Sequence, residues 1–356
     1  MEYKEEKKSS LSTRDTFSPI ELMEDLVYNS PTLRRPPPPP PSEPPLMVAG
    51  GDIFETSNQY SIAYSTDKGL TWNGSEDSKS IFLTTKSIAW NGTKWIAVGF
   101  AAIGTTYSIA YSTNGINWTG IENSNQIIST GSDIIWDGSR WIIVGQSTNS
   151  NTLAYSIDGI NWIYPTNSPH NERSLSIETD GKIWVVGGQK IDGNDIVYTN
   201  NIIDGTWSFA TNTFTSNCND IKYNGTRWVA VGDDTDSEEF SSIKYSDDGK
   251  TWQNCTNTFV GLNGGRGIGW NGTRWIAVGM GNNPVEHIKY STDAISWQNS
   301  SSNPLENETY GVAWNGTRWV AVGDGSKTIC YSNDNGQTWI AVSNSDSLFY
   351  IGNSVL

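Results

Sequence analysis

The sequence has 356 residues and is acidic, with 23 Lys and Arg against 38 Asp and Glu and a formal net charge of −15 at pH 7. Surfaces that bind nucleic acid need clustered Lys and Arg, so this balance argues against a nucleic-acid partner. No run of 18 apolar residues is present, so we expect no membrane insertion. The first six residues lack the apolar run of a signal peptide, and we expect no secretion by that route.

Residues 1–45 differ in composition from the rest of the chain. Residues 1–17 are polar and charged and are predicted to be disordered. Ser18, Pro19 and Glu21 then form a capping box, which predicts a short helix over about residues 18–28. The helix would carry an apolar stripe, made by Ile20, Met23, Leu26 and Val27.

A proline-rich linker follows the predicted helix. Six consecutive prolines occupy positions 36–41, and residues 36–45 are predicted to form extended polyproline II. Arg34, Pro37 and Pro40 have the spacing of an SH3 ligand. Two interpretations of residues 1–45 remain open: a spacer, or a docking arm that binds another protein through the helix stripe and these three residues.

A turn sequence, Ser-x-Asp-x-Gly-x-x-Trp, recurs along the rest of the chain. It is clear at residues 65–72, 246–252 and 332–339, and looser copies end at Trp118, Trp162, Trp207 and Trp297. The closing tryptophans are 42 to 46 residues apart. A constant period of this length is typical of a repeat architecture.

A second repeated sequence alternates with the first and is represented by residues 90–99, Trp-Asn-Gly-Thr-Lys-Trp-Ile-Ala-Val-Gly. The Asn-Gly pair favours a type I′ turn, and the flanks alternate with the period of a strand, so this is a β-hairpin of strands A and B. A third strand, C, comes next, as at residues 242–245, and the Ser-x-Asp turn leads into a fourth, D. Each unit is therefore predicted to be a four-stranded antiparallel propeller blade.

The two ends of the repeat region predict how the ring closes. Residues 46–51 have the pattern of strand B with no strand A before them, and residues 348–353 have the pattern of strand A with no strand B after them. We predict an all-β, seven-bladed propeller over residues 46–356, whose closing blade takes strand A from the C-terminus and strands B, C and D from the N-terminal side. This closure leaves no lone terminal strand as an exposed edge.

The turn sequence looks like the Asp-box, or BNR repeat, of the sialidase-like propeller superfamily. The hairpin sequence resembles repeats in proteins of large DNA viruses. The first resemblance implies the propeller fold but little about function, since such propellers include glycosidases, sorting receptors and assembly factors. The second implies a cytoplasmic or virion-associated protein.

The aspartates of the turns are candidates for structure rather than catalysis, because a catalytic residue would not recur in each blade. We expect each carboxylate to accept bonds from turn N–H groups and each tryptophan to fill the layer between blades. The residues concerned are Asp67, Trp72, Asp158, Trp162, Asp248, Trp252, Asp293, Trp297, Asp334 and Trp339.

The resemblance implies, for a sialidase, an arginine triad, a Tyr-Glu nucleophile pair and an acid/base Asp. Of the six arginines after residue 46, four share one repeat position beside the A–B turn: Arg140, Arg227, Arg274 and Arg318. Arg173 and Arg266 remain, so a typical sialidase is not expected. Another glycosidase needs only two suitably spaced carboxylates and stays open.

The loops that vary most between copies are the B–C and D–A loops. One of them holds the densest acidic cluster, Asp233, Asp234, Asp236, Glu238 and Glu239. It is interpreted either as a solvated loop or as a docking patch for a basic partner. The three cysteines have no CxxC spacing and are expected to be free thiols; no cofactor or metal motif is evident.

These observations predict a non-enzymatic structural or protein-interaction propeller. Its N-terminal arm would bind a protein partner and tether the ring to a larger assembly such as a virus particle. The alternative is a carbohydrate-active propeller that binds or hydrolyses a glycan at the channel mouth.

Overall fold

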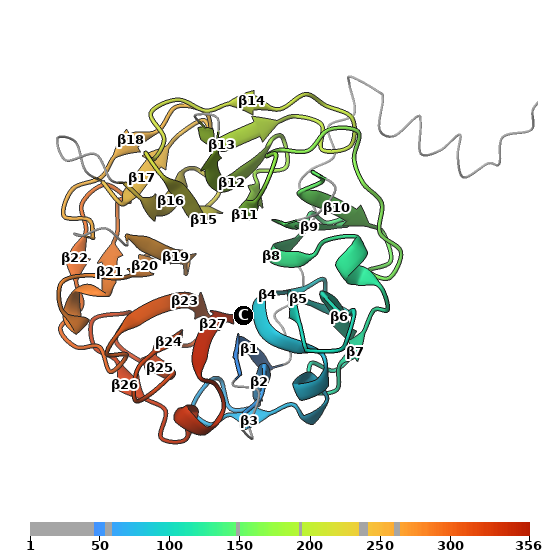
Figure 1. Cartoon of the computed structure of the whole chain (residues 1–356). Coiled ribbons are helices and arrows are strands. Elements are labelled where there is room, and N and C mark those ends of the chain that lie inside the picture. Colours follow the sequence, from blue (N-terminus) through green and yellow to red (C-terminus); the bar gives the residue numbers. More distant parts are fainter. Residues whose placement is uncertain (1–45, 54–58, 147–149, 192–193, 235–240, 260–263) are drawn as a thin grey trace, which may run out of the picture. The chain divides into compact units, whose positions relative to one another are not determined.

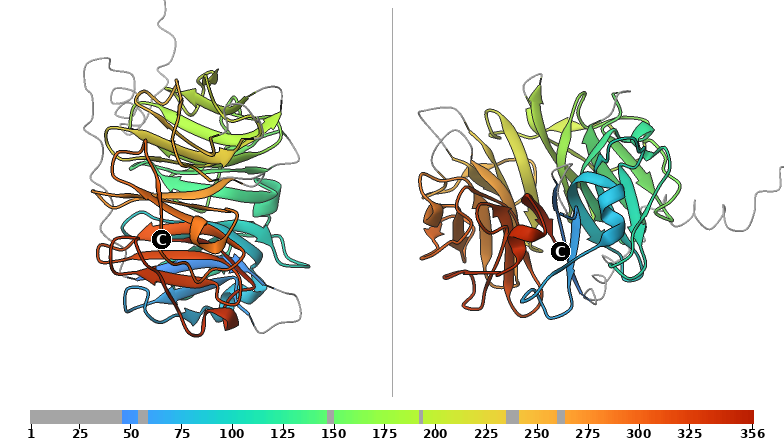
Figure 2. Two further views of the ribbon diagram at one scale, coloured as in Figure 1. Left: turned by 90° about the vertical axis from the view of Figure 1, so that its left-hand side faces the viewer. Right: turned by 60° about the horizontal axis from the view of Figure 1, so that its bottom comes forward.

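The computed structural model describes residues 46–53, 59–146, 150–191, 194–234, 241–259 and 264–356. The predicted helix and polyproline linker of residues 1–45 lie outside the described residues. The described chain folds into seven antiparallel blades arranged around a central channel (Figure 1). In the side views the blades stand next to one another, with their strands running between the two faces of the ring (Figure 2). The predicted all-β propeller is confirmed.

Strand A is the innermost strand of each blade and lines the channel. Six of these strands belong to the same chain segment as their blade, and the seventh comes from the C-terminus. The A strands are β4 (Phe82–Trp90), β8 (Thr130–Trp136), β11 (Ser174–Thr179), β15 (Asn217–Tyr223), β19 (Gly265–Trp270), β23 (Glu308–Trp314) and β27 (Ile351–Val355).

Strand B lies between strands A and C and is the most buried of each blade, as its apolar run of Trp, Ile, Val and Ala predicts. In five blades its first Trp packs on the last aromatic residue of strand A, with ring centroids 4.7 to 5.5 Å apart. The B strands are β1 (Met47–Asp52), β5 (Trp95–Ala101), β9 (Trp141–Gln146), β12 (Trp184–Ile191), β16 (Trp228–Asp233), β20 (Trp275–Gly279) and β24 (Trp319–Asp324).

Strands C and D complete the blades on the outside of the ring. The C strands are β2 (Ile62–Ser65), β6 (Ile109–Ser112), β10 (Leu153–Ser156), β13 (Asn194–Thr199), β17 (Ile243–Ser246), β21 (Ile288–Ser291) and β25 (Ile329–Ser332). The D strands are short: β3 (Asn73–Gly74), β7 (Thr119–Gly120), β14 (Ser208–Phe209), β18 (Gln253–Asn254), β22 (Gln298–Asn299) and β26 (Ile340–Ala341). In the third blade a single bridge between Tyr155 and Ile163 takes the place of strand D.

The helical segments of the described chain are short 3-10 turns: η1 (Glu76–Ser80), η2 (Ser124–Gln126), η3 (Pro284–Glu286) and η4 (Ser345–Ser347). No helix in the described ranges is long or apolar enough to cross a membrane.

The ring closes where β27 pairs antiparallel with β1. The backbones of Val48 and Leu356 exchange two hydrogen bonds of 3.0 and 2.9 Å. This is the closure predicted from the two ends, with one correction: the strand begins at Ile351, not at Leu348. Leu348 and Phe349 follow η4 and are 3% and 1% exposed. Their apolar character reflects burial in a bend rather than strand pairing.

The Ser-x-Asp turns have the geometry expected of them. Asp67 accepts the backbone N–H groups of Leu70 and Thr71 at 3.1 and 2.9 Å, while Ser65 Oγ accepts the N–H of Gly69 at 2.8 Å. Asp158, Asp248, Asp293 and Asp334 accept equivalent bonds. Burial opposes ionisation of Asp67, but the bonds from Thr71, Ser65 and Leu70 outweigh it and lower its pKa.

The tryptophans that close these turns pack between neighbouring blades. Trp72 of the first blade is 1% exposed and belongs to one cluster with Val320, Val322 and Ile329 of the last blade. Trp252 and Trp297 are also fully buried, and Trp162 is half-buried. The turn tryptophans therefore contribute to the core, as expected.

In three blades the basic residue of the repeated hairpin ties the blade to the next one. Lys94 Nζ donates to the carbonyl of Asp158 at 2.6 Å, Arg227 to that of Asp293 at 3.0 Å and Arg274 to that of Asn335 at 3.0 Å. These contacts join an A–B turn to the Ser-x-Asp turn of the following blade, so both turns lie on one face of the ring. We call this the turn face, and the opposite face, formed by the B–C and D–A loops, the loop face.

Candidate functional site

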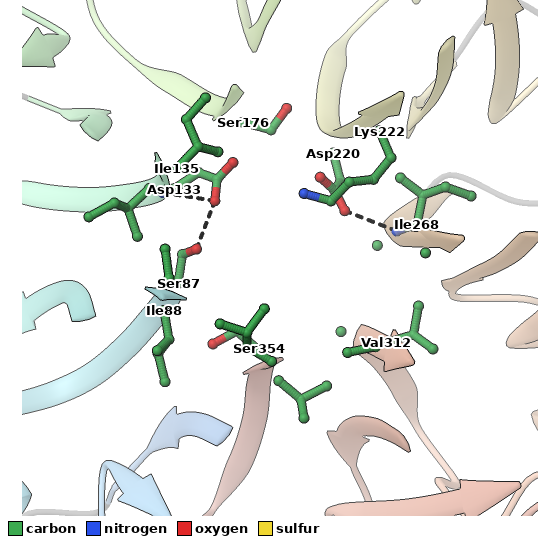
Figure 3. Close-up of a pocket in the computed structure, with 18 of the residues that line it drawn as sticks. Ser87, Ile88, Asp133, Ile135, Ser176, Asp220, Lys222, Ile268, Val312 and Ser354 are labelled. Atoms are coloured by element: carbon green, nitrogen blue, oxygen red, sulfur yellow. Dashed lines mark hydrogen bonds between the residues drawn. The ribbon is translucent and has the colours of Figure 1, made fainter. Parts of the chain in front are cut away.

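The central channel forms a cavity of about 570 Å³. All seven A strands line it, and Leu356 at the C-terminus lies beside it. Figure 3 shows its side chains converging from opposite blades, with Asp133 on one side and Asp220 and Lys222 on the other. Equivalent residues of the seven A strands lie at the same height along the channel. Their side chains therefore form successive rings, which we call tiers.

A β-bulge in each A strand creates the tier nearest the loop face. In each strand the pairing register shifts and leaves one channel-lining residue unpaired with strand B; β4 has a second shift, between Phe82 and Thr84. Such a bulge redirects a side chain without breaking the sheet. We call these seven channel-lining residues the bulge ring: Lys86, Ser132, Leu175, Asn219, Arg266, Tyr310 and Asn353.

The next residue of each A strand forms a tier of small or acidic side chains. Asp133 accepts bonds from Ser87 Oγ at 2.7 Å on the preceding blade and from the N–H of Ile177 at 3.0 Å on the following blade. Asp220 likewise accepts the N–H of Ile268 on the following blade at 2.9 Å (Figure 3). These carboxylates accept backbone N–H groups of the innermost strand of the following blade, and so hold adjacent blades together.

Burial perturbs the acids in the middle of the channel. It raises the pKa of Asp220 to about 7, with Lys222 acting in the opposite direction and Asp133 in the same one. Burial also raises the pKa of Glu178, whose carboxylate lies 3.6 Å from Lys222 Nζ. The middle of the channel therefore holds three carboxyl groups and one ammonium.

The loop-face mouth of the channel is a pocket of about 430 Å³. The whole bulge ring lines it together with Arg173, Gln189, Asn217 and Asp233. On one side Arg266 contacts Asp233 at 3.0 Å and Glu308 at 2.6 Å, and Tyr310 donates to Glu308 at 2.7 Å. On another side Lys86 donates to the amide oxygen of Asn353 at 3.2 Å.

The two described residues of the acidic cluster are buried and do not lie on an exposed surface. Asp233 and Asp234 are 8% and 3% exposed. Asp233 is paired with Arg266, and Asp234 lies 3.5 Å from Lys244 and accepts a bond from Thr215. Neither carboxylate is available to a basic partner. Asp236, Glu238 and Glu239 lie outside the described residues, as do the arm residues Ile20, Met23, Leu26, Val27, Arg34, Pro37 and Pro40.

The bulge ring was missed in the sequence, although a signal for it exists. Its residues stand two places before a repeated Ile or Val of strand A, and their chemistry changes from blade to blade while the Ile or Val does not. From the sequence, Arg173 and Arg266 are too few to form the arginine triad of a sialidase. The structure brings both to the same mouth and adds Lys86.

The described residues contain no group of three or more His, Cys, Asp or Glu that could hold a metal ion. Cys218, Cys255 and Cys330 are free and buried. Burial raises the pKa of Cys255 to about 12 and that of the other two as well.

The fold and channel define a seven-bladed β-propeller with a polar, charged pore. No family model matches the sequence, and no curated protein matches it. Among solved structures, a crystal structure of the computationally designed Ika8 protein is 11% identical in sequence, with a TM-score of 0.49 over 74% of each chain.

Proposed function

We propose that the chain is a non-enzymatic binding propeller, a rigid ring for protein interaction that its N-terminal arm tethers to a larger assembly. The observation that carries this proposal is the state of the channel carboxylates. Asp133 and Asp220 accept backbone N–H groups, Glu178 is paired with Lys222, and Asp233 with Arg266. These are the acids that line the cavity in the described chain.

Hydrolysis at such a site needs one carboxyl group to donate a proton and a second to attack or to activate water. A carboxylate whose oxygens already accept two backbone bonds keeps its position but is poorly placed for attack. The channel acids therefore support a structural role, and the ring offers a stable platform for binding.

The tethering part of the proposal rests on the sequence of residues 1–45. The apolar stripe of the predicted helix needs a surface to pack on, because a helix of about three turns is marginal alone. The resemblance of the hairpin repeat to those of large DNA viruses supports an assembly such as a virus particle.

A comparison of three proteins tests tethering: the full chain, a form that starts at Leu46, and the full chain with Leu26→Asp. We expect the full chain to capture one protein from the native source. Neither the form that starts at Leu46 nor the Leu26→Asp variant should capture that protein. A full chain carrying Glu21→Gln, outside the stripe, is the matched control and should retain it. Equal capture by all four would exclude the arm as the tether.

A second candidate, a carbohydrate-active propeller, is favoured by one observation. Asp220, with a pKa of about 7, is half protonated near neutral pH, as a general acid requires, and it faces Asp133 across the channel (Figure 3). A panel of aryl glycosides distinguishes the candidates. Turnover that Asp220→Asn abolishes, in a variant that remains folded, would replace the binding proposal with a glycosidase.

A further inference from the structure

We infer that the loop-face mouth of the channel binds a divalent oxyanion, a phosphate or sulfate group, between Lys86 and Arg173. Both residues line the same pocket of about 430 Å³, together with Ser132. They come from three consecutive blades: Lys86 on β4, Ser132 on β8, and Arg173 immediately before β11. This site goes beyond the proposed function, because it involves neither the arm nor a protein partner.

The charges in the mouth are unevenly paired. Arg266 is paired with two carboxylates, those of Asp233 and Glu308. Lys86 and Arg173 form no ion pair with any described residue, and the partner of Lys86 is the neutral amide of Asn353. The mouth thus presents two cations that form no ion pair with the described residues, inside a chain whose net charge is −15.

Asp52 is the acid that acts on Lys86 through its charge, but the two side chains form no ion pair. It attracts Lys86 electrostatically, but its Oδ1 accepts a bond of 2.6 Å from Asn353. Burial lowers the pKa of Lys86, and Arg173 lowers it further. Burial lowers the pKa of Arg173 as well. Two desolvated cations that repel each other are costly, and an anion between them offsets that cost.

Unused hydrogen-bond donors point to the same place. Arg173 Nε and Ser132 Oγ are buried and have no hydrogen-bond partner among the described residues. A buried donor without an acceptor costs about 1–3 kcal/mol, so such groups normally have a partner. An oxyanion provides several acceptors at once, and charge-assisted bonds to Arg and Lys are the strong ones.

The charge of the ligand is inferred from the two cations of the mouth that form no ion pair, Lys86 and Arg173. Two positive charges match a divalent group better than a monovalent one, and the acidic remainder of the chain disfavours loosely held anions. The backbone on either side is anchored: Arg173 pairs with Gln146 of the preceding blade, and its carbonyl accepts the N–H of Gln189 at 3.2 Å. The position of Arg173 is therefore preorganised for binding.

Isothermal titration of the full chain with sodium sulfate and with inorganic phosphate, against sodium chloride at equal ionic strength, tests the site. We expect saturable binding of one sulfate or phosphate and none of chloride. Arg173→Gln and Lys86→Gln should each weaken binding about tenfold or more, as loss of a charge-assisted bond does. The matched controls Arg227→Gln and Lys182→Gln remove the same charges on the turn face and should change affinity less than about twofold, because the turn face is opposite the mouth and salt screens charges there.

Folding of the variants does not obscure the result. Arg173→Gln removes a desolvated cation with no partner, so its melting temperature without added anion should equal or exceed that of the parent chain. Comparison with phenyl phosphate identifies the source: tighter binding of the ester indicates a phosphate group on a larger ligand, and tighter binding of the inorganic ions a free anion. Sulfate and phosphate heats equal to those of chloride, or affinities unchanged in both mouth variants, would overturn the inference.

Discussion

Phe349 tests whether ring closure stabilises the whole molecule. Its side chain is 1% exposed and belongs to a cluster that joins β1 of the first blade to β24 of the last, through Met47, Val320 and Val322. Replacing a buried Phe by Ala costs about 3–5 kcal/mol, through lost burial and the cavity left behind. Since domains are stable by about 5–15 kcal/mol, Phe349→Ala should remove a large share of the free energy of unfolding.

Urea denaturation measures this change as a fall in the midpoint with an unchanged slope. The matched control is Phe209→Ala in β14, where the ring is 65% exposed and the cost should stay below about 1 kcal/mol. Hydrogen exchange adds a local measurement: the N–H of Val48, which bonds to the carbonyl of Leu356, should exchange faster in Phe349→Ala. Equal costs for the two phenylalanines would refute the view that closure at β27 supports the ring.

Three further predictions concern the channel and the core. Asp133→Asn should lower the free energy of unfolding, measured in urea, by about 1–3 kcal/mol, because an amide cannot accept all the bonds from Ser87 and Ile177. Ser176 is the equivalent residue of β11 and its hydroxyl has no partner among the described residues, so Ser176→Ala should lower it by less than about 1 kcal/mol. Because the native pKa of Asp220 is about 7, above the usual aspartate value of 3.8, its stabilising contribution is complete below pH 3.8 and is lost as the pH rises through 7. The free energy of unfolding should therefore fall between pH 5 and 7, and Asp220→Asn should flatten that slope. A disulfide reagent such as DTNB should react slowly with the native chain and rapidly with three thiols once it is unfolded, because all three cysteines are buried with raised pKa values.

The fold was predictable because its signals are local and repeated. Asn-Gly turns specify hairpins, and each Ser-x-Asp turn is closed by bonds within five residues, such as those from Leu70 and Thr71 to Asp67. The start of β27 was misplaced because Leu348 and Phe349 are apolar for a reason other than strand pairing. A bend after η4 buries them, and an apolar pair alone does not distinguish the two environments.

The site was less predictable because its partners are distant in sequence. Asp233 and Asp234 occur in an acidic run that is typical of a solvated loop, yet Arg266 and Lys244 bury and pair them. The contact between Arg266 and Glu308 spans 42 residues, close to one repeat period, and so joins adjacent blades. Such pairs become visible only when the ring places the strands side by side.

Comparison among the blades shows which positions recur in each blade and which positions differ. Residues that build the ring, such as the strand B core and the turn tryptophans, recur because each blade must pack against two neighbours. A bulge residue is released from the pairing ladder and faces the channel, so its identity has little effect on the fold. The chain uses that freedom unevenly: three of the seven bulge positions hold Lys86, Arg266 and Tyr310, and the others hold smaller side chains without charge. Chemistry that is specific to this protein is therefore to be sought at the loop-face mouth, where the repeat places the fewest constraints.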